Sequence, residues 1–291
     1  MPTSDDYINR VNRVLNLIHR DIAADLSADR LAVAATWSES HFHRRFRQVT
    51  GESVHGYIRR TRLEQAANQL MFNPDRPVID IAEQCGFQSL SSFGRAFRQT
   101  WQMSPGRWRQ QGQQRGPAPY LDDAEIAASF ERIALQPLPA PQLLEFSSQA
   151  VAYVRHRGYG RSIRLAWQML QHWAQQEGHA SDRQIGLHHS NPALVPLAEC
   201  RYVACLAIED SLPRRGAISS MRIPGGLHAV FRLQGRYGEL LPWLSRVQQE
   251  WLPRSGLRPR TIPAHVRYQR NQFLDSEERF ELELCLPVTL G

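Results

Sequence analysis

Two segments within the first 110 residues of the chain resemble each other, and this repeat constrains the fold more than any other feature. The first segment reads Leu31-Ala32-x-x-Ala35-x-Trp37-Ser38, followed by Phe42-x-x-x-Phe46. The second reads Ile81-Ala82-x-x-Cys85-Gly86-Phe87-x-Ser89, followed by Phe93-x-x-x-Phe97. Small, apolar and capping residues that recur in the same order indicate two copies of one supersecondary unit.

Each copy has the pattern of a helix-turn-helix unit, with bounds near 27–50 and 77–102. A small residue in the first helix, Ala32 or Ala82, allows the second helix to cross it closely. Ser38 and Ser89 are expected to cap the second helix, because a serine hydroxyl accepts hydrogen bonds from the N–H groups of a first turn. The paired phenylalanines lie four residues apart on one helical face and are expected to be core.

The opposite face of each second helix carries short polar residues and arginine. A helix with such a face can enter the major groove of DNA, where arginine binds O6 and N7 of guanine. We therefore predict double-stranded DNA as a partner. Gly94 has no side chain, so the second copy is expected to discriminate bases less well and to bind phosphate through Arg98. The candidate DNA-contacting residues are Ser40, His43, Arg44 and Arg47 in the first copy and Ser91, Ser92, Arg95 and Arg98 in the second.

Residues 53–71, between the two copies, read as one amphipathic helix that ends at Asn73-Pro74. A helix of this length spans roughly 27 Å. It could hold the two recognition helices about one DNA turn (~34 Å) apart, so that a single chain reads two successive major grooves.

The charge is concentrated in the same region. The net charge is +7 and every basic residue is arginine, a uniform choice that points to genome composition. Residues 1–115 hold 16 Arg against 11 acids, whereas residues 116–291 hold 19 against 17. A positively charged region of this kind could bind a polyanion such as DNA. A helix face that is simply exposed to solvent would have the same composition.

Several classes of protein are not expected. There is no run of 18 apolar residues and no apolar stretch near Met1, so neither a membrane span nor a secretory signal is predicted. The four cysteines form no CxxC pair, so we expect no zinc site, no disulfide framework and a reducing cytoplasm. No phosphate-binding loop, GxSxG or HExxH is present, and we expect no catalytic residue, metal or cofactor.

The first part of the chain resembles the AraC/XylS family of transcription regulators over about 100 residues. The matching pieces include Ser38-x-x-His41-Phe42-x-Arg44-x-Phe46, Ile81-Ala82-x-x-x-Gly86-Phe87 and Ser104-Pro105-Gly106-Arg107-Trp108, where the family usually has tyrosine in place of Trp108. The resemblance implies an all-α DNA-binding domain at 1–112, with Ser40, His43 and Arg44 at base-reading positions of the first unit. Ser91, Ser92 and Arg95 match those positions in the second unit. It also implies a regulator that works in the cytoplasm at the bacterial nucleoid, with RNA polymerase as a second partner and activation as one possible output.

A linker is predicted at 113–135, where 111–120 is rich in Gln, Gly and Pro, and 121–135 could form a short bridging helix. The remainder, 136–291, contains a second and weaker duplication. Each copy reads as a strand, a helix and two strands, and the visible signature is Arg157-Gly158-Tyr159-Gly160 against Gly235-Arg236-Tyr237-Gly238. Two such βαββ units can form one concave antiparallel sheet with helices behind it. The predicted fold class is therefore multidomain, with an all-α part and an α+β part.

This second part resembles the GyrI-like (SOUL/BmrR-type) effector-binding domain, through Pro224-Gly225-Gly226, Trp251-Leu252-Pro253 and Glu281-Leu282-Glu283-Leu284-Cys285-Leu286-Pro287. The resemblance implies that Glu283 faces a pocket lined with aromatic rings. Alternation along 280–286 places the acids on one sheet face and the apolar residues on the other. A solvent-facing strand would show the same alternation.

A carboxylate among aromatic rings would suit a small lipophilic cation. The candidate ligand-binding residues are Glu283, Tyr268, Tyr153, Trp167 and Tyr202. Two alternatives remain open. The second part could instead be a hydrolase of small molecules that uses Glu283 and Tyr268, or a module that binds a protein such as RNA polymerase or gyrase.

Overall fold

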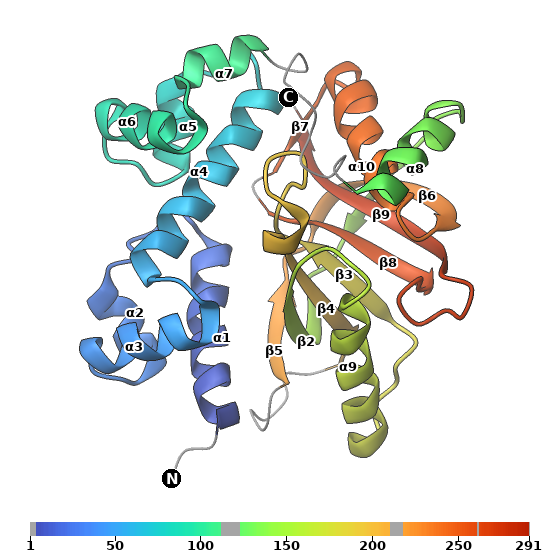
Figure 1. Ribbon diagram of the computed structural model, residues 1–291, viewed down its shortest axis with the longest axis horizontal. Helices are drawn as coiled ribbons and strands as arrows, with labels where there is room; N and C mark the ends of the chain where they lie inside the picture. The colour runs from blue at the N-terminus through green and yellow to red at the C-terminus, as the bar shows by residue number, and fades with distance from the viewer. Residues whose placement is uncertain (1–3, 112–122, 210–217, 261, 291) are drawn as a thin grey trace. The chain divides into compact units, whose positions relative to one another are not determined.

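The computed structural model describes residues 4–111, 123–209, 218–260 and 262–290 (Figure 1). The chain divides into two compact units, with 4–111 in the first and the later described residues in the second. Ten of the predicted linker residues, 113–122, lie outside the described residues. In the described part, no helix is both long and apolar enough to cross a membrane.

The first unit is entirely helical, as the repeat predicts. Its long helix α4 (Val54–Phe72) carries α2 (Ala28–Ala35) and α3 (Glu39–Thr50) at one end and α5 (Val78–Gln84) and α6 (Leu90–Trp101) at the other (Figure 1). The helix α1 (Ser4–Arg20) packs on α2 and α3, and α7 (Pro105–Gln111) packs on α4 and α6.

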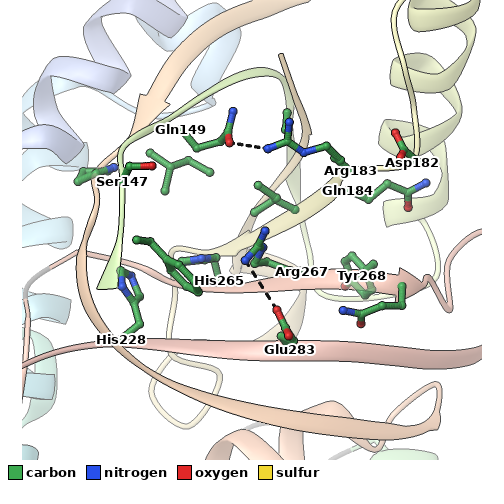
Figure 2. A pocket seen from close by; sticks show the side chains of 16 residues that line it. Ser147, Gln149, Asp182, Arg183, Gln184, His228, His265, Arg267, Tyr268 and Glu283 are labelled. Atoms are coloured by element: carbon green, nitrogen blue, oxygen red, sulfur yellow. Dashed lines mark hydrogen bonds and ion pairs between the residues drawn. The ribbon is translucent and has the colours of Figure 1, made fainter. Parts of the chain in front are cut away.

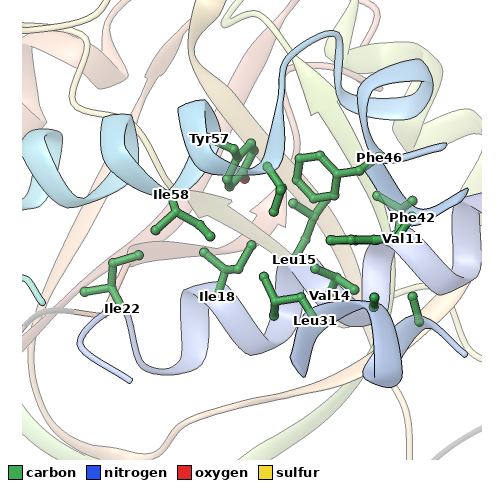
Figure 3. Close-up of a cluster of buried hydrophobic side chains, with 13 residues drawn as sticks. Val11, Val14, Leu15, Ile18, Ile22, Leu31, Phe42, Phe46, Tyr57 and Ile58 are labelled. Carbon is green, nitrogen blue, oxygen red and sulfur yellow. The ribbon is translucent and has the colours of Figure 1, made fainter. Parts of the chain in front are cut away.

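The first helix-turn-helix copy is built around a buried apolar cluster (Figure 3). Phe42 and Phe46 of α3 are fully buried and meet Tyr57 and Ile58 of α4. The rings of Phe46 and Tyr57 lie edge to face with centroids 5.6 Å apart, a favoured geometry for aromatic pairs. The second copy repeats this arrangement: Phe93 and Phe97 of α6 are fully buried. The predicted core faces of both helices are confirmed.

The two turns have the same backbone shape but different residues. Thr36 ends α2 with φ 57°, and Gly86 follows α5 with φ 80°. This left-handed region suits glycine and is strained for a β-branched residue such as threonine. A Cβ at Gly86 would lie 2.7 Å from the guanidinium of Arg62. The second copy therefore needs glycine for its close approach to α4 as well as for its φ angle.

The second unit contains one antiparallel sheet. Its strands are β1 (Gln142–Phe146), β2 (Gln149–Arg157), β3 (Gln184–His188), β4 (Arg201–Ala207), β5 (Ser219–Ile223), β6 (Gly226–Arg236), β7 (Leu257–Pro259), β8 (Ala264–Arg270) and β9 (Arg279–Leu290). Their order is β1-β6-β9-β8-β3-β4-β2-β5, and β7 pairs with β9. The helices are α8 (Ala124–Ala134), α9 (Ile163–Glu177) and α10 (Leu240–Arg246), the last continuing as a π-turn at Val247–Trp251 and a 3₁₀-turn at Leu252–Arg254.

The predicted duplication is visible in the strand order. The first copy is β2-α9-β3-β4 and the second is β6-α10-β8-β9, and the copies join where β3 pairs with β8. Each copy gains an edge strand from the segment that precedes the other copy, because β1 pairs with β6 and β5 pairs with β2. The βαββ interpretation of the sequence is therefore confirmed.

The helices lie on one face of this sheet. The ring of Trp167 in α9 lies 5.8 Å from that of Tyr268 in β8, and the ring of Trp251, just after α10, lies 5.1 Å from that of Phe231 in β6. The bridging helix suggested for 121–135 is α8, which packs on α10 as part of the second unit.

Candidate functional site

The non-core face of α3 is open to solvent. Ser40, Arg44 and Arg47 are exposed. The Arg44 guanidinium lies 3.1 Å from Nδ1 of His41, and the His41 pKa is lowered by desolvation and then by the charges of Arg44 and Arg45. His43 is half-buried, with its Nε2 3.6 Å from a carboxylate oxygen of Glu39. The face therefore presents two exposed cations, one hydroxyl and the imidazole of His43.

The corresponding face of α6 is also open but simpler. Ser91, Arg95 and Arg98 are exposed, and a Cβ added to Gly94 would meet nothing within 4 Å. Ser92 is half-buried, and its hydroxyl donates to the Ser89 carbonyl at 2.9 Å. The Ser92 hydroxyl proton is thus already used within the helix, which leaves Ser91 as the freer hydroxyl.

The capping prediction holds for one copy only. The Ser89 hydroxyl accepts a hydrogen bond from the Ser92 N–H at 3.2 Å. Ser38 occupies the same position before α3, but its side chain makes no capping hydrogen bond, so the prediction was wrong there. The α3 N-terminus is thus less tightly fixed by local hydrogen bonds than that of α6.

Several arginines of the basic segment have internal roles. Arg60 forms ion pairs with Glu52 at 3.1 Å and Glu64 at 2.6 Å. Arg62 donates hydrogen bonds to the carbonyls of Ile22 and Ala24 at 3.0 and 3.2 Å. Within the described part of the chain, Arg47, Arg95 and Arg98 pair with no acid. The positive charge that no acid neutralises therefore lies mainly on α3 and α6. The total number of arginines in the segment does not show this concentration.

The second unit contains a cavity of about 340 Å³ on the sheet face opposite α9 (Figure 2). Cross-strand partners share a sheet face, and the register places Tyr153, Cys205, Ile185, Arg267 and Glu283 in one row across the sheet. Residues from eight strands line the cavity. They include Phe146, Gln149, Arg183, Ile185, Ile223, His228, His265, Arg267 and Glu283.

Glu283 sits between two arginines, of which Arg267 lines this cavity with it. One carboxylate oxygen lies 3.7 Å from Nη1 of Arg267 on β8 (Figure 2), and the other lies 3.7 Å from Nε of Arg232 on β6. The side chain of Glu283 is 18% exposed, against 42% for Arg267 and 76% for Arg232. The buried member of the group is therefore the anion, and the exposed members are the cations.

Aromatic and imidazole rings form one wall of the cavity. Phe146 lies 5.1 Å from the ring of His228, and the Arg267 guanidinium lies 5.0 Å over Phe146. Burial lowers the pKa of His265 to about 3, helped by the charges of His228 and Arg267, and burial also lowers the pKa of His228. Both imidazoles are therefore neutral at pH 7, and Nδ1 of His228 donates to the Gly226 carbonyl at 2.7 Å.

The structure places three of the four predicted ligand-binding rings on the sheet face opposite Glu283. Trp167 and Tyr202 are fully buried on the helix-covered face, away from Glu283. Tyr268 lines the edge of the cavity, but it neighbours Arg267 on β8 and so points to the other face, where its hydroxyl lies 3.3 Å from that of Tyr202. Only Tyr153 shares the face of Glu283, and it is fully buried in an apolar cluster.

The pairing of Glu283 with Tyr268 that a hydrolase would need is not formed. Burial raises the pKa of the Tyr268 hydroxyl above its ordinary value. That hydroxyl approaches another tyrosine, and no hydrogen bond joins it to Glu283 in the described part of the chain.

Sequence reasoning missed the residues that surround Glu283. Arg232 and Arg267 lie on strands far apart in the chain, and Phe146 ends the edge strand β1. The alternation of β8 could have indicated that Arg267 and Tyr268 point to opposite faces. The pairing of β6 and β8 on either side of β9 could not be read from spacing.

The fold defines a two-part protein: a helical unit with two matched, arginine-bearing recognition helices, and a duplicated α+β unit with a cavity on its open sheet face. Residues 31–111 match the family model of a helix-turn-helix domain. Residues 139–289, just over half of the 291, match that of a GyrI-like small molecule binding domain. The chain therefore belongs to the GyrI-like family and carries a helix-turn-helix domain in front of it.

Relatives resemble the helical unit. The chain is 36% identical over 104 residues to the probable transcriptional regulator LumQ of Photobacterium leiognathi, which covers 35% of this chain and 42% of that protein. It is 37% identical over 87 residues to the HTH-type transcriptional regulator MtrA of Neisseria gonorrhoeae, or 30% of this chain and 29% of that one. The chain thus spans less than half the length of either.

Among solved structures, an AraC-type transcriptional regulator from Chromobacterium violaceum is 26% identical, with a TM-score of 0.34 over 37% of this chain and 95% of that one.

Proposed function

We propose that this protein is a sequence-specific DNA-binding transcription regulator whose GyrI-like domain binds a small-molecule effector. The observation that carries the DNA-binding part is the recurrence of exposed arginines at equivalent positions of α3 and α6. Arginine at such positions can bind guanine in the major groove or the phosphate backbone. The names of relatives as transcriptional regulators support the same conclusion.

The arrangement of the helical unit supports recognition by a single chain. The helix α4 has 19 residues, a length of roughly 28 Å at 1.5 Å per residue. It separates the two helix-turn-helix copies by a distance comparable to one turn of DNA, ~34 Å. We therefore propose that one molecule binds two successive major grooves, with Ser40, His43 and Arg44 reading bases in one and Arg95 in the other.

The effector-binding part rests on the family match and on the cavity beside Glu283. Its volume is near the lower end of the range of small-molecule pockets, about 300–1,000 Å³. Polar groups on one side and apolar walls at Ile185 and Ile223 on the other suit an amphipathic molecule. RNA polymerase is the further partner that a regulator bound beside a promoter would contact, and the proposal places the protein at the nucleoid.

The DNA-binding proposal is tested by selecting bound sequences from random duplexes with the full chain and footprinting the enriched sequence. We expect a protected site of about 20 base pairs, with two contacted segments about 10 base pairs apart. The logarithm of the binding constant should fall against that of the salt concentration with a slope near −0.9 per phosphate contacted. A chain that enriches no sequence, or behaves like its Arg44→Ala/Arg95→Ala double variant, would contradict the proposal.

A further inference from the structure

We propose that the cavity beside Glu283 binds an organic anion with a flat apolar body, and not a lipophilic cation. This inference rests on the proposed effector-binding function and specifies the class of the ligand. The surroundings of Glu283 carry it, because in this chain the carboxylate that would attract a cation is already paired.

The exposed fractions of Glu283 and its two arginine partners determine which charge a ligand meets first. Arg267 and Arg232 are 42% and 76% exposed, whereas the carboxylate between them is 18% exposed. Of the two arginines, Arg267 lines the cavity, so a cation in the cavity would compete with its guanidinium for the carboxylate. An anion would meet the Arg267 guanidinium first.

The arginines retain donors for a ligand. A guanidinium has five N–H donors in a planar fork, and Arg267 approaches Glu283 through Nη1. Arg183, on the far rim of the cavity, donates to Gln149 at 2.8 Å and pairs with no acid in the described part of the chain. Asp182 beside it lines the cavity but is exposed to solvent. Each of these two cations at the cavity therefore keeps donors for charge-assisted hydrogen bonds to an anion.

The remaining walls favour a flat apolar body. Phe146 presents its ring beneath the Arg267 guanidinium at 5.0 Å, and Ile185 and Ile223 face the same space. His228 and His265 are neutral because burial lowers both pKa values. A lipophilic cation prefers an aromatic cage, whereas Trp167 and Tyr202 are buried on the opposite sheet face and Phe146 already faces the Arg267 guanidinium.

The test compares three probes of the same size that differ in charge: 2-naphthoate, the neutral 2-naphthamide and the cation 2-naphthylmethylammonium. Binding to the full chain is measured by calorimetry at low salt. We expect 2-naphthoate to bind at least ~10-fold more tightly than the amide, and the cation to bind most weakly. Charge-assisted hydrogen bonds contribute enough to give a ~10- to 100-fold preference.

Two variants distinguish the two ligand classes, because an anionic and a cationic ligand predict opposite changes in affinity. Arg267→Gln should weaken 2-naphthoate binding ~10-fold or more and leave the amide unchanged. Glu283→Gln removes the competing carboxylate and should strengthen 2-naphthoate binding several-fold. Arg258→Gln, a change of an exposed arginine on β7 outside the cavity, is the matched control and should alter none of the three affinities.

The outcomes separate the ligand class from the wider function. Preferred binding of the cation, with loss of that binding in Glu283→Gln, would overturn the anion inference and leave effector binding intact. The anion inference would also be overturned if 2-naphthoate did not bind, or if neither variant changed its affinity. The DNA footprint does not depend on these probes, so it continues to test the regulator independently.

Discussion

The two helix-turn-helix copies share a scaffold and differ in the groups that they present. Both bury two phenylalanines at equivalent positions and both place a left-handed residue at the turn, Thr36 or Gly86. The exposed faces have diverged: α3 presents His43 beside its arginines, whereas α6 has Gly94 at that position. The packing of the repeat is therefore constrained, whereas its exposed surface can change.

The largest expected effects are on the buried scaffold. Phe42→Ala and Phe93→Ala each remove a fully buried ring, and each should cost about 3–5 kcal/mol of local stability. Native-state hydrogen exchange should show protection lost mainly in α2 and α3 for the first variant and in α5 and α6 for the second. Val33→Ala, at a side chain that is 75% exposed, is the control. Equal loss in both copies from either variant would contradict two separate cores.

The next effect distinguishes the two contact faces. Arg44→Ala should cost ~1–3 kcal/mol of DNA binding, concentrated at one base position. Arg95→Ala should cost a similar or smaller amount, spread more evenly over sequences, because Gly94 beside it reads no base. Affinities for single-base variants of the selected site measure both profiles, with Arg30→Ala on α2 as the control. A uniform loss for Arg44→Ala would make Arg44 a phosphate contact.

A smaller difference is expected at the caps. Ser89→Ala removes the hydrogen bond to the Ser92 N–H and should cost ~1 kcal/mol. Ser38→Ala should cost a few tenths of that, because Ser38 makes no capping hydrogen bond. Exchange rates of the first-turn amides of α6 and α3 provide the measurement. Equal costs at the two positions would show that Ser38 does cap its helix in solution.

The smallest effect concerns Gly94. Gly94→Ala places a methyl group in open space and should stabilise α6 by ~0.5–1 kcal/mol, since glycine is a poor helix former. The matched change Gly86→Ala should destabilise the second copy, because of its φ of +80° and the nearby Arg62. DNA affinity of Gly94→Ala should stay within about twofold. A loss beyond tenfold would indicate that the α6 backbone contacts DNA at Gly94.

Much of the local structure could be predicted because it follows from periodicity. The amphipathic pattern at 163–177 predicts the helix that α9 forms with the same bounds, and alternation predicts β9. The paired phenylalanines predict the core faces of α3 and α6. In each case the burial pattern repeats at the period of the element, so neighbouring residues along the chain carry the signal.

The surroundings of Glu283 could not be predicted in the same way. The aromatic residues predicted beside Glu283 are rings on elements that were expected to lie nearby. The register of the sheet determines which of these rings share the sheet face of Glu283. Tyr268 and Arg267 are adjacent in sequence and point to opposite faces. Only the pairing of β9 with β6 and β8 brings Arg232 and Arg267 to the carboxylate.

The two duplications, the helical and mixed parts of the chain, and the residues that face outward on α3 and α6 could all be inferred from residue patterns. The pairing of individual arginines and the sheet face of each aromatic ring became known only from the fold. This difference arises because periodic burial is a local property of the chain. Charge pairing and cavity lining depend instead on contacts between strands, and the order of the strands in the sheet cannot be inferred from their order along the chain.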